Sequence, residues 1–197
     1  MDINQIITDL RNFSTPELCD GMDNPKVLPY EIMRKVTNHK IVGPAFTVEV
    51  PDGVSGIIPE AIAACKKGDV LVIAGKGNCS KSYWGDFRSF CAKSREIEGV
   101  VIDGAFRDID GCENEGIPIF ARAIVPRSAE KAAVGKLNVP IICGDVEIHP
   151  GDLIVGDENG VIVFSPENAK DIMERSKKKI EAETERRLQW QQHMGTK

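Results

Sequence analysis

The 197-residue chain has no apolar run long enough to cross a bilayer, and its first residues lack the basic and then apolar order of a signal peptide. It has no excess of basic residues either, because 30 acidic against 25 basic residues give a formal net charge of -5. This balance disfavours nucleic-acid binding through a broad cationic face. We therefore expect a cytoplasmic protein that binds neither membranes nor nucleic acids.

Side chains that ligate soft metals are scarce. The six cysteines lie at wide spacings without a Cys-x-x-Cys pair, which argues against a zinc knuckle or a thioredoxin-type site. No two of the three histidines, His39, His149 and His193, are close in sequence. Any metal is therefore expected to be a hard cation held by carboxylates and water.

The chain also lacks internal repeats and Pro/Gly/Ser-rich linkers, so one domain is expected over residues 1–197. Helical and strand-like patterns alternate first, and a run of short strands follows, which indicates a mixed α/β domain with more than one sheet layer. The expected strands are 41–50, 70–74, 100–102, 117–124, 139–143, 146–148, 152–156 and 160–164. The expected helices are 3–13, 18–22, 56–66, 85–97 and 107–115.

The last part of the chain predicts one long helix over residues 166–192. Twelve of the residues from Lys170 to Arg187 are charged, so only a thin apolar stripe remains. That stripe consists of Ile172, Met173, Ile180 and Leu188. Such a helix either packs by one edge or reaches a neighbouring subunit, and a solvated terminal helix is the plainer alternative.

Two segments combine glycine and charge at the ends of expected strands. Residues 75–86 are interpreted as a polar loop between a strand and a helix, and residues 99–108 deliver the pair Arg107-Asp108 to a helix start. Ligands of open α/β sheets bind beyond the carboxyl ends of strands, so both segments are expected to face one pocket. The first segment does not satisfy the Walker A pattern, and alone it is more typical of a turn.

The residue types in these segments suit a small anionic ligand. Backbone N–H groups at a helix beginning with Gly85-Asp86 can bind a carboxylate or an enolate oxygen. Arg107 can hold a carboxylate in a bidentate fork, and Asp108, with Asp86 as a second candidate, can anchor a divalent cation. Together these groups would bind and polarise a 2-oxo acid such as pyruvate. The plainer alternative is that Asp108 only stabilises the helix dipole.

The motif Trp84-Gly85-Asp86, followed after twenty residues by Arg107-Asp108, resembles the signature of the RraA-like proteins. These include class II pyruvate aldolases that act on 4-hydroxy-4-methyl-2-oxoglutarate and 4-carboxy-4-hydroxy-2-oxoadipate. Further matches are Glu17-Leu18-Cys19-Asp20 and the segments 139–144 and 150–153. The resemblance covers about residues 14 to 190. It implies a swivelling β/β/α sandwich, assembled as a homotrimer or a dimer of trimers.

The resemblance also implies roles for single residues. Arg107 would bind the pyruvyl carboxylate and oxo group and stabilise the enolate. Asp108 would ligate Mg²⁺ or Mn²⁺, and Asp86 would hold a metal-bound water. Backbone amides would take the substrate carboxylate, and a neighbouring subunit's terminal helix would complete the water shell. The amides are those of Gly85, Asp86, Phe87 and Arg88, and the helix offers Glu181, Glu183 or Glu185.

The implied activity is a metal-dependent lyase reaction that cleaves a 4-hydroxy-2-oxo acid to pyruvate and a second oxo acid. Oxaloacetate decarboxylation would use the same enolate. The alternative is an RraA-type regulator that binds ribonuclease E or another protein without catalysis. That regulator lacks the Arg-Asp pair, which this chain keeps at Arg107-Asp108, so the enzyme is favoured.

Three residues near the motif need separate interpretation. Phe87-Arg88 stands where the family commonly has an aliphatic residue and then Ala. If the Arg88 side chain enters the pocket, it adds a second cation and favours a more acidic or a phosphorylated substrate. Asp103 is expected to brace the loop that carries Arg107.

Overall fold

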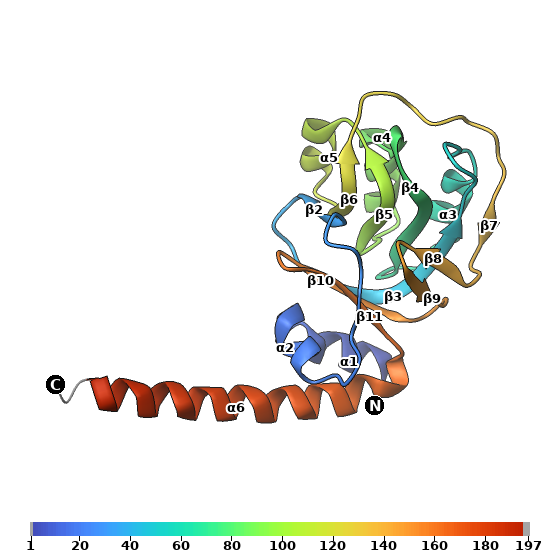
Figure 1. Ribbon diagram of the computed structural model, residues 1–197. Helices are drawn as coiled ribbons and strands as arrows, with labels where there is room; N and C mark the ends of the chain where they lie inside the picture. Colours follow the sequence, from blue (N-terminus) through green and yellow to red (C-terminus); the bar gives the residue numbers. More distant parts are fainter. Residues whose placement is uncertain (1, 195–197) are drawn as a thin grey trace.

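The computed structural model describes residues 2–194 and contains a central sheet with helices on both sides (Figure 1). Four neighbouring strands of this sheet are parallel, and the others join it antiparallel. The parallel strands are β3 (Ile41–Glu49), β4 (Val70–Trp84), β5 (Gly99–Phe106) and β6 (Ile119–Ile124). The antiparallel strands are β1 (Lys26–Val27), β2 (Met33–Val36), β7 (Lys136–Leu137), β10 (Leu153–Asp157) and β11 (Gly160–Phe164).

The core has three apolar clusters, one for each interface between layers. Helices α3 (Ile58–Ala64), α4 (Asp86–Ser94) and α5 (Ile109–Glu115) cover one face of the parallel strands. The hairpin of β8 (Ile141–Cys143) and β9 (Val146–Ile148) packs with β10 and β11 on the other face. Helices α1 (Ile3–Leu10), α2 (Thr15–Asp20) and α6 (Ala169–Met194) close the far side. The expected α/β domain with several layers is confirmed.

Strand β5 shows why the parallel part of the sheet is so apolar. All eight of its residues are buried, because helices cover one face and strands cover the other. Val100 and Ile102 belong to the cluster under the helices, whereas Val101 packs into the cluster on the opposite face. Strand β5 therefore ends in a fixed position, and Arg107 directly follows it.

The polar loop predicted over residues 75–86 is wrong, because strand β4 continues to Trp84. Lys76 and Gly77 adopt left-handed backbone angles, and the register to β5 shifts between Ile73 and Asn78. After this bulge, Trp84 pairs with Phe106 of β5. The bulge interrupts the sequence pattern of a strand but leaves the chain in the sheet, so Gly85 stands at a strand end.

Other boundaries differ by a few residues. Helix α2 begins at Thr15 and not at Leu18, because Ser14 and Glu17 form a capping box that starts the helix earlier. Helix α5 begins at Ile109, with Asp108 as its N-cap, and not at Arg107. Strands β1, β2 and β7 are short and were not expected from the sequence.

A short 3₁₀ helix, η1 (Pro166–Asn168), leads into α6, and only the beginning of α6 packs on the chain itself. Its buried residues are Ala169, Ile172, Met173 and Ser176, next to α1 and α2. Residues 181–194 are exposed and project away from the body (Figure 1). Among the described residues, no helix is apolar enough over a sufficient length to cross a membrane. Of the predicted domain 1–197, Met1 and residues 195–197 lie outside the described part.

Candidate active site

The ends of β4 and β5 bring the two motif segments together. Trp84 and Phe106 are neighbours in the sheet, and the N–H of Arg107 donates to the carbonyl oxygen of Trp84 at 3.1 Å. Gly85 and Arg107 therefore leave adjacent strands at the same edge. Helices α4 and α5 begin one and two residues later, so their first turns face each other.

A cavity of about 500 Å³ lies beside these helix starts. Apart from the glutamates expected from a neighbouring subunit, every site residue expected from the sequence lines it, from Gly85 to Arg88 together with Arg107 and Asp108. The other lining residues are Ser55, Gly56, Pro59, Ile62, Ser82, Trp84, Cys91, Ser128 and Lys131. Its size and its mixture of apolar and convergent polar groups are typical of a small-molecule site.

Arg107 and Asp108 form an ion pair within this cavity. Arg107 Nε lies 3.1 Å from Asp108 Oδ2, and the two side chains are 42% and 38% exposed. An ion pair this exposed contributes little to stability, so its main effect is to orient the guanidinium. Asp108 has left-handed backbone angles (φ 59°, ψ 51°), a conformation that is costly for a residue other than glycine and that concentrates at functional sites.

Asp86 lies at the start of α4, close to the start of α5. Its Oδ1 accepts a hydrogen bond from the N–H of Phe87 at 2.7 Å, and a Cβ at Gly111 would lie 2.5 Å from its own Cβ. Burial, reinforced by the negative charges of Asp108 and Asp86, raises the pKa of the Cys112 thiol to about 11. Both carboxylates therefore lie within electrostatic range of one buried thiol.

These two carboxylates determine which metal the cavity could hold. Among residues 2–194, no group of three or more His, Cys, Asp or Glu side chains is arranged to bind a metal ion. A cation here would have Asp108 as its protein ligand from this chain and water for the remainder, with Asp86 holding one of the waters. That donor set fits Mg²⁺ or Mn²⁺, which keep several waters, and does not fit the closed nitrogen and sulfur sites of zinc.

The first turn of α4 supplies hydrogen-bond donors to the same cavity. Helix geometry leaves the first N–H groups without an intrahelical carbonyl, and Gly85, the N-cap, has no side chain to accept from them. The N–H of Phe87 donates to the Asp86 carboxylate, so it is not available for the substrate carboxylate that it was expected from the sequence to bind. The N–H groups of Asp86 and Arg88 have no such hydrogen bond to a side-chain carboxylate of the described residues. The rings of Phe87 and Phe90 stack with their centroids 6.4 Å apart, and Phe87 is 73% exposed.

The Arg88 side chain folds into the cavity wall, which answers the question that the sequence left open. Its Nη2 donates to Ser55 O at 2.8 Å and to Ser55 Oγ at 3.2 Å, and its Nη1 donates to Tyr83 O. Burial, followed by the positive charge of Arg107, lowers the pKa of the Arg88 guanidinium to about 10. Arg88 is therefore a second cation in the cavity at neutral pH.

The sequence did not indicate the wall formed by residues 55–56 and 128–131. Ser55 N donates to Glu130 O at 2.8 Å, Gly56 N donates to Ala132 O at 3.1 Å, and Ala129 N donates to Ser82 O at 3.0 Å. These contacts join segments that are distant in sequence and have no strand pattern. The one local signal is Gly56, where a Cβ would lie 2.2 Å from Ala132 O.

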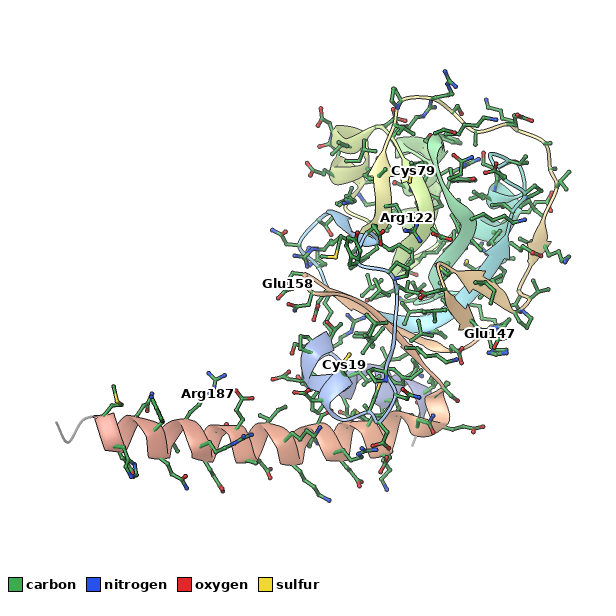
Figure 2. The ribbon with its side chains drawn as sticks, in the orientation of Figure 1. Cys19, Cys79, Arg122, Glu147, Glu158 and Arg187 are labelled. Atoms are coloured by element: carbon green, nitrogen blue, oxygen red, sulfur yellow. The ribbon has the colours of Figure 1, made fainter. Side chains whose placement is uncertain are left out.

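Two other expectations have different outcomes. Asp103 does not brace the Arg107 loop, because its side chain leaves the opposite face of β5. It accepts from Arg122 Nε at 2.5 Å and from Gly144 N at 3.0 Å, beside a separate cavity of about 790 Å³. The glutamates Glu181, Glu183 and Glu185 lie on the exposed part of α6, where Figure 2 shows Arg187 far from the sheet, so their contribution to a neighbour's site stays a prediction.

Comparisons with known proteins identify the family of this chain. The RraA-like family model (Aldolase/RraA) matches residues 15–163. A protein of Halalkalibacterium halodurans named "Putative 4-hydroxy-4-methyl-2-oxoglutarate aldolase" is 39% identical over 173 residues, which are 88% of this chain and 82% of that protein.

Solved structures share the fold. An uncharacterized protein from Pseudomonas syringae pv. tomato has a TM-score of 0.82 and 28% identity, covering 92% of this chain and 85% of its own. The RNA-processing inhibitor RraA from Thermus thermophilis has a TM-score of 0.72 and 24% identity, covering 78% and 93%, which shows a common fold alone. By its family match and its relatives, this chain belongs to the RraA-like (Aldolase/RraA) family.

Proposed function

We propose that this protein is a metal-dependent lyase that cleaves a 4-hydroxy-2-oxo acid, of the 4-hydroxy-4-methyl-2-oxoglutarate type, to pyruvate and a second oxo acid. The observation that carries the proposal is the convergence of Arg107, Asp108 and the first turn of α4 on one cavity. The aldolase name of the Halalkalibacterium halodurans relative supports the same reaction class.

In this proposal the substrate's pyruvyl end lies against Arg107 and α4. Asp108 holds Arg107 through Nε, so the Nη side of the fork can face the substrate carboxylate and the C2 oxygen. Negative charge develops on the C2 oxygen during cleavage. The guanidinium and the N–H groups of Asp86 and Arg88 stabilise that charge in place, because they need no reorganisation.

Cleavage breaks the bond between C3 and C4 of the substrate. The C4 hydroxyl loses its proton and C4 becomes the carbonyl carbon of the second product, while the electron pair of the broken bond forms the enolate of pyruvate. Protonation of that enolate at C3 releases pyruvate. We assign Asp86 to hold the water that exchanges these protons, because the carboxylate lies in the cavity and is already oriented by the Phe87 N–H.

Asp108 is the residue that would ligate Mg²⁺ or Mn²⁺, and Asp86 would hold one of the ion's waters. When bound there, the ion would supply positive charge that polarises the 2-oxo group. The same enolate stabilisation would serve oxaloacetate decarboxylation, in which carbon dioxide takes the place of the second oxo acid. The proposal further includes a cytoplasmic homotrimer or dimer of trimers, in which residues 181–194 of α6 contact a neighbouring subunit.

The test measures pyruvate released from 4-hydroxy-4-methyl-2-oxoglutarate and from oxaloacetate, with added Mg²⁺ or Mn²⁺ and with EDTA. We expect turnover with the metals and its loss in EDTA. Undiminished turnover in EDTA would remove the metal from the proposal. Tight binding of ribonuclease E in a pull-down, without any pyruvate release, would favour the regulatory function that RraA from Thermus thermophilis represents.

A further inference from the structure

Arg88 brings a positive charge into the cavity that no carboxylate of the described residues neutralises. All its hydrogen bonds go to neutral oxygens, two from Ser55 and one from Tyr83. Arg107, by contrast, is paired with Asp108. A half-buried cation is costly unless an opposite charge compensates it, so this position favours an anionic ligand.

Lys131 adds a second uncompensated charge to the same cavity. It lines the same cavity and forms no ion pair with any residue in the described part of the chain. The charge of Lys81, in strand β4, is by contrast compensated, because its Nζ lies 2.8 Å from Glu130 Oε1. The cavity is therefore lined by three cations, Arg88, Arg107 and Lys131, and by the two acids Asp86 and Asp108.

The positions of these cations separate two regions of the cavity. Arg107 lies beside Gly85, the N-cap of α4, because a Cβ at Gly85 would come 3.5 Å from Arg107 Nε, and the pyruvyl end is proposed to bind there. Arg88 binds Ser55, on the wall that residues 128–131 complete. A volume of about 500 Å³ has room for a ligand that contacts both regions at once.

We propose that Arg88 and Lys131 form a second anion subsite, which selects substrates that carry a second carboxylate remote from the pyruvyl carboxylate. The proposal rests on the lyase function above and adds the residues that determine its specificity. Arg88 acts as the fixed donor, because Ser55 and Tyr83 hold its guanidinium in place before any ligand arrives. Lys131 acts as an exposed point charge at the edge of the subsite.

The experiment uses two substrates that differ only at the far end. 4-Hydroxy-4-methyl-2-oxoglutarate carries a carboxylate there, and 4-hydroxy-4-methyl-2-oxopentanoate carries a methyl group. Each cleavage of the dicarboxylate yields two pyruvates and each cleavage of the monocarboxylate yields pyruvate and acetone, so one pyruvate assay, counted per cleavage, gives kcat and KM for each. The wild-type protein is expected to prefer the dicarboxylate by at least about tenfold in kcat/KM, because a charged hydrogen bond contributes about 1.5–3 kcal/mol.

Four variants locate the preference. Arg88→Met should raise KM for the dicarboxylate about tenfold or more and leave KM for the monocarboxylate within about twofold. Lys131→Met should raise the same KM about two- to fivefold, as expected for an exposed charge pair. Lys81→Met removes a cation from the same surface outside the cavity and should change neither value. Arg88→Lys restores the charge and should recover part of the preference.

Binding measured by calorimetry keeps the subsite testable without cleavage. The wild-type protein should bind 2-oxoglutarate more tightly than 2-oxopentanoate, and Arg88→Met and Lys131→Met should each reduce that difference. Arg88→Met also removes bonds to Ser55 and Tyr83, so thermal unfolding is recorded, and Lys131→Met supplies the answer if Arg88→Met does not fold. Absence of pyruvate from both substrates contradicts the lyase. The subsite is contradicted if Arg88→Met or Lys131→Met weakens the binding of 2-oxoglutarate and 2-oxopentanoate equally, or changes neither.

Discussion

Gly85 lies so close to Asp108 that a Cβ at position 85 would come within 2.6 Å of Asp108 Oδ2. The φ angle of Gly85 is -168°, an extended value that any residue can adopt. Glycine is therefore required here for space and not for backbone freedom. The contact joins the end of β4 to the carboxylate that begins α5, so the two motif segments depend on each other.

Replacement of this glycine should displace the carboxylate. Gly85→Ala is expected to weaken Mg²⁺ affinity and pyruvate release about 10- to 100-fold, as for changes that misplace a metal ligand. Gly111→Ala is the comparison, because its Cβ would press on Asp86 Cβ instead, at 2.5 Å. Equal metal affinity in Gly85→Ala and the wild type, measured by calorimetry, would contradict the assignment of Asp108 as the principal ligand.

Arg107→Lys tests the guanidinium fork. Lysine keeps the charge but cannot present two parallel donors, so kcat/KM should fall about 10²-fold, the size of a lost oxyanion donor. Arg95→Lys is a matched control, since Arg95 ends α4 and bonds the carbonyl oxygens of Ala63 and Cys65 outside the cavity. A near-normal rate in Arg107→Lys would mean that charge alone suffices.

Asp108→Asn should abolish metal-dependent turnover. The amide keeps the shape of the side chain but loses the negative charge that a hard cation requires. Mn²⁺ binding, followed by electron paramagnetic resonance, should fall at least about tenfold. Asp110→Asn changes an acid of the same first turn that does not line the cavity, and should bind Mn²⁺ normally. If both variants bind equally, the metal is held elsewhere.

Asp157 predicts how stability depends on acid. Burial alone would raise its pKa, but hydrogen bonds from Thr15 and Asn159 outweigh burial and hold the pKa of this carboxyl below its usual value. A lowered pKa in the folded state stabilises the fold above the unfolded pKa of about 3.9, and this contribution is lost as pH falls through the folded value.

Asp157→Asn should therefore lower the free energy of unfolding by about 1–3 kcal/mol at pH 7 and flatten its decline below pH of about 4. Urea unfolding at several pH values measures both effects. Asp20→Asn, an exposed neighbour on α2, should leave the curve unchanged. A parallel acid decline in Asp157→Asn and the wild type would show that other carboxyls control it.

A stop codon after Ile180 tests the proposed role of α6 in assembly. No residue from 181 to 194 is buried, so the shortened chain should fold, and its unfolding temperature at high dilution should stay within about 3 °C. Light scattering should show a trimer or hexamer for the full chain and a smaller particle for the shortened one. An unchanged mass would place the subunit contact on another surface.

The sequence predicted the site better than the elements around it. Gly85 and Arg107 could be placed together because the ends of adjacent parallel strands meet at one edge. Strand β4 was missed beyond Ala74, because a bulge at Lys76-Gly77 and polar residues after it hide a strand that distant pairing maintains. The wall at Ser55 and Lys131 was missed for a similar reason, since its hydrogen bonds join segments 75 residues apart.

The exposed end of α6 has a consequence for how this protein can be observed. Isolated helices of this length unravel readily in water, and fully exposed ion pairs such as Glu183–Arg187 add little to their stability. Unless another surface covers it, the amide protons of residues 181–194 should exchange with solvent almost at once. Their exchange rate would then report subunit association, residue by residue and at any concentration.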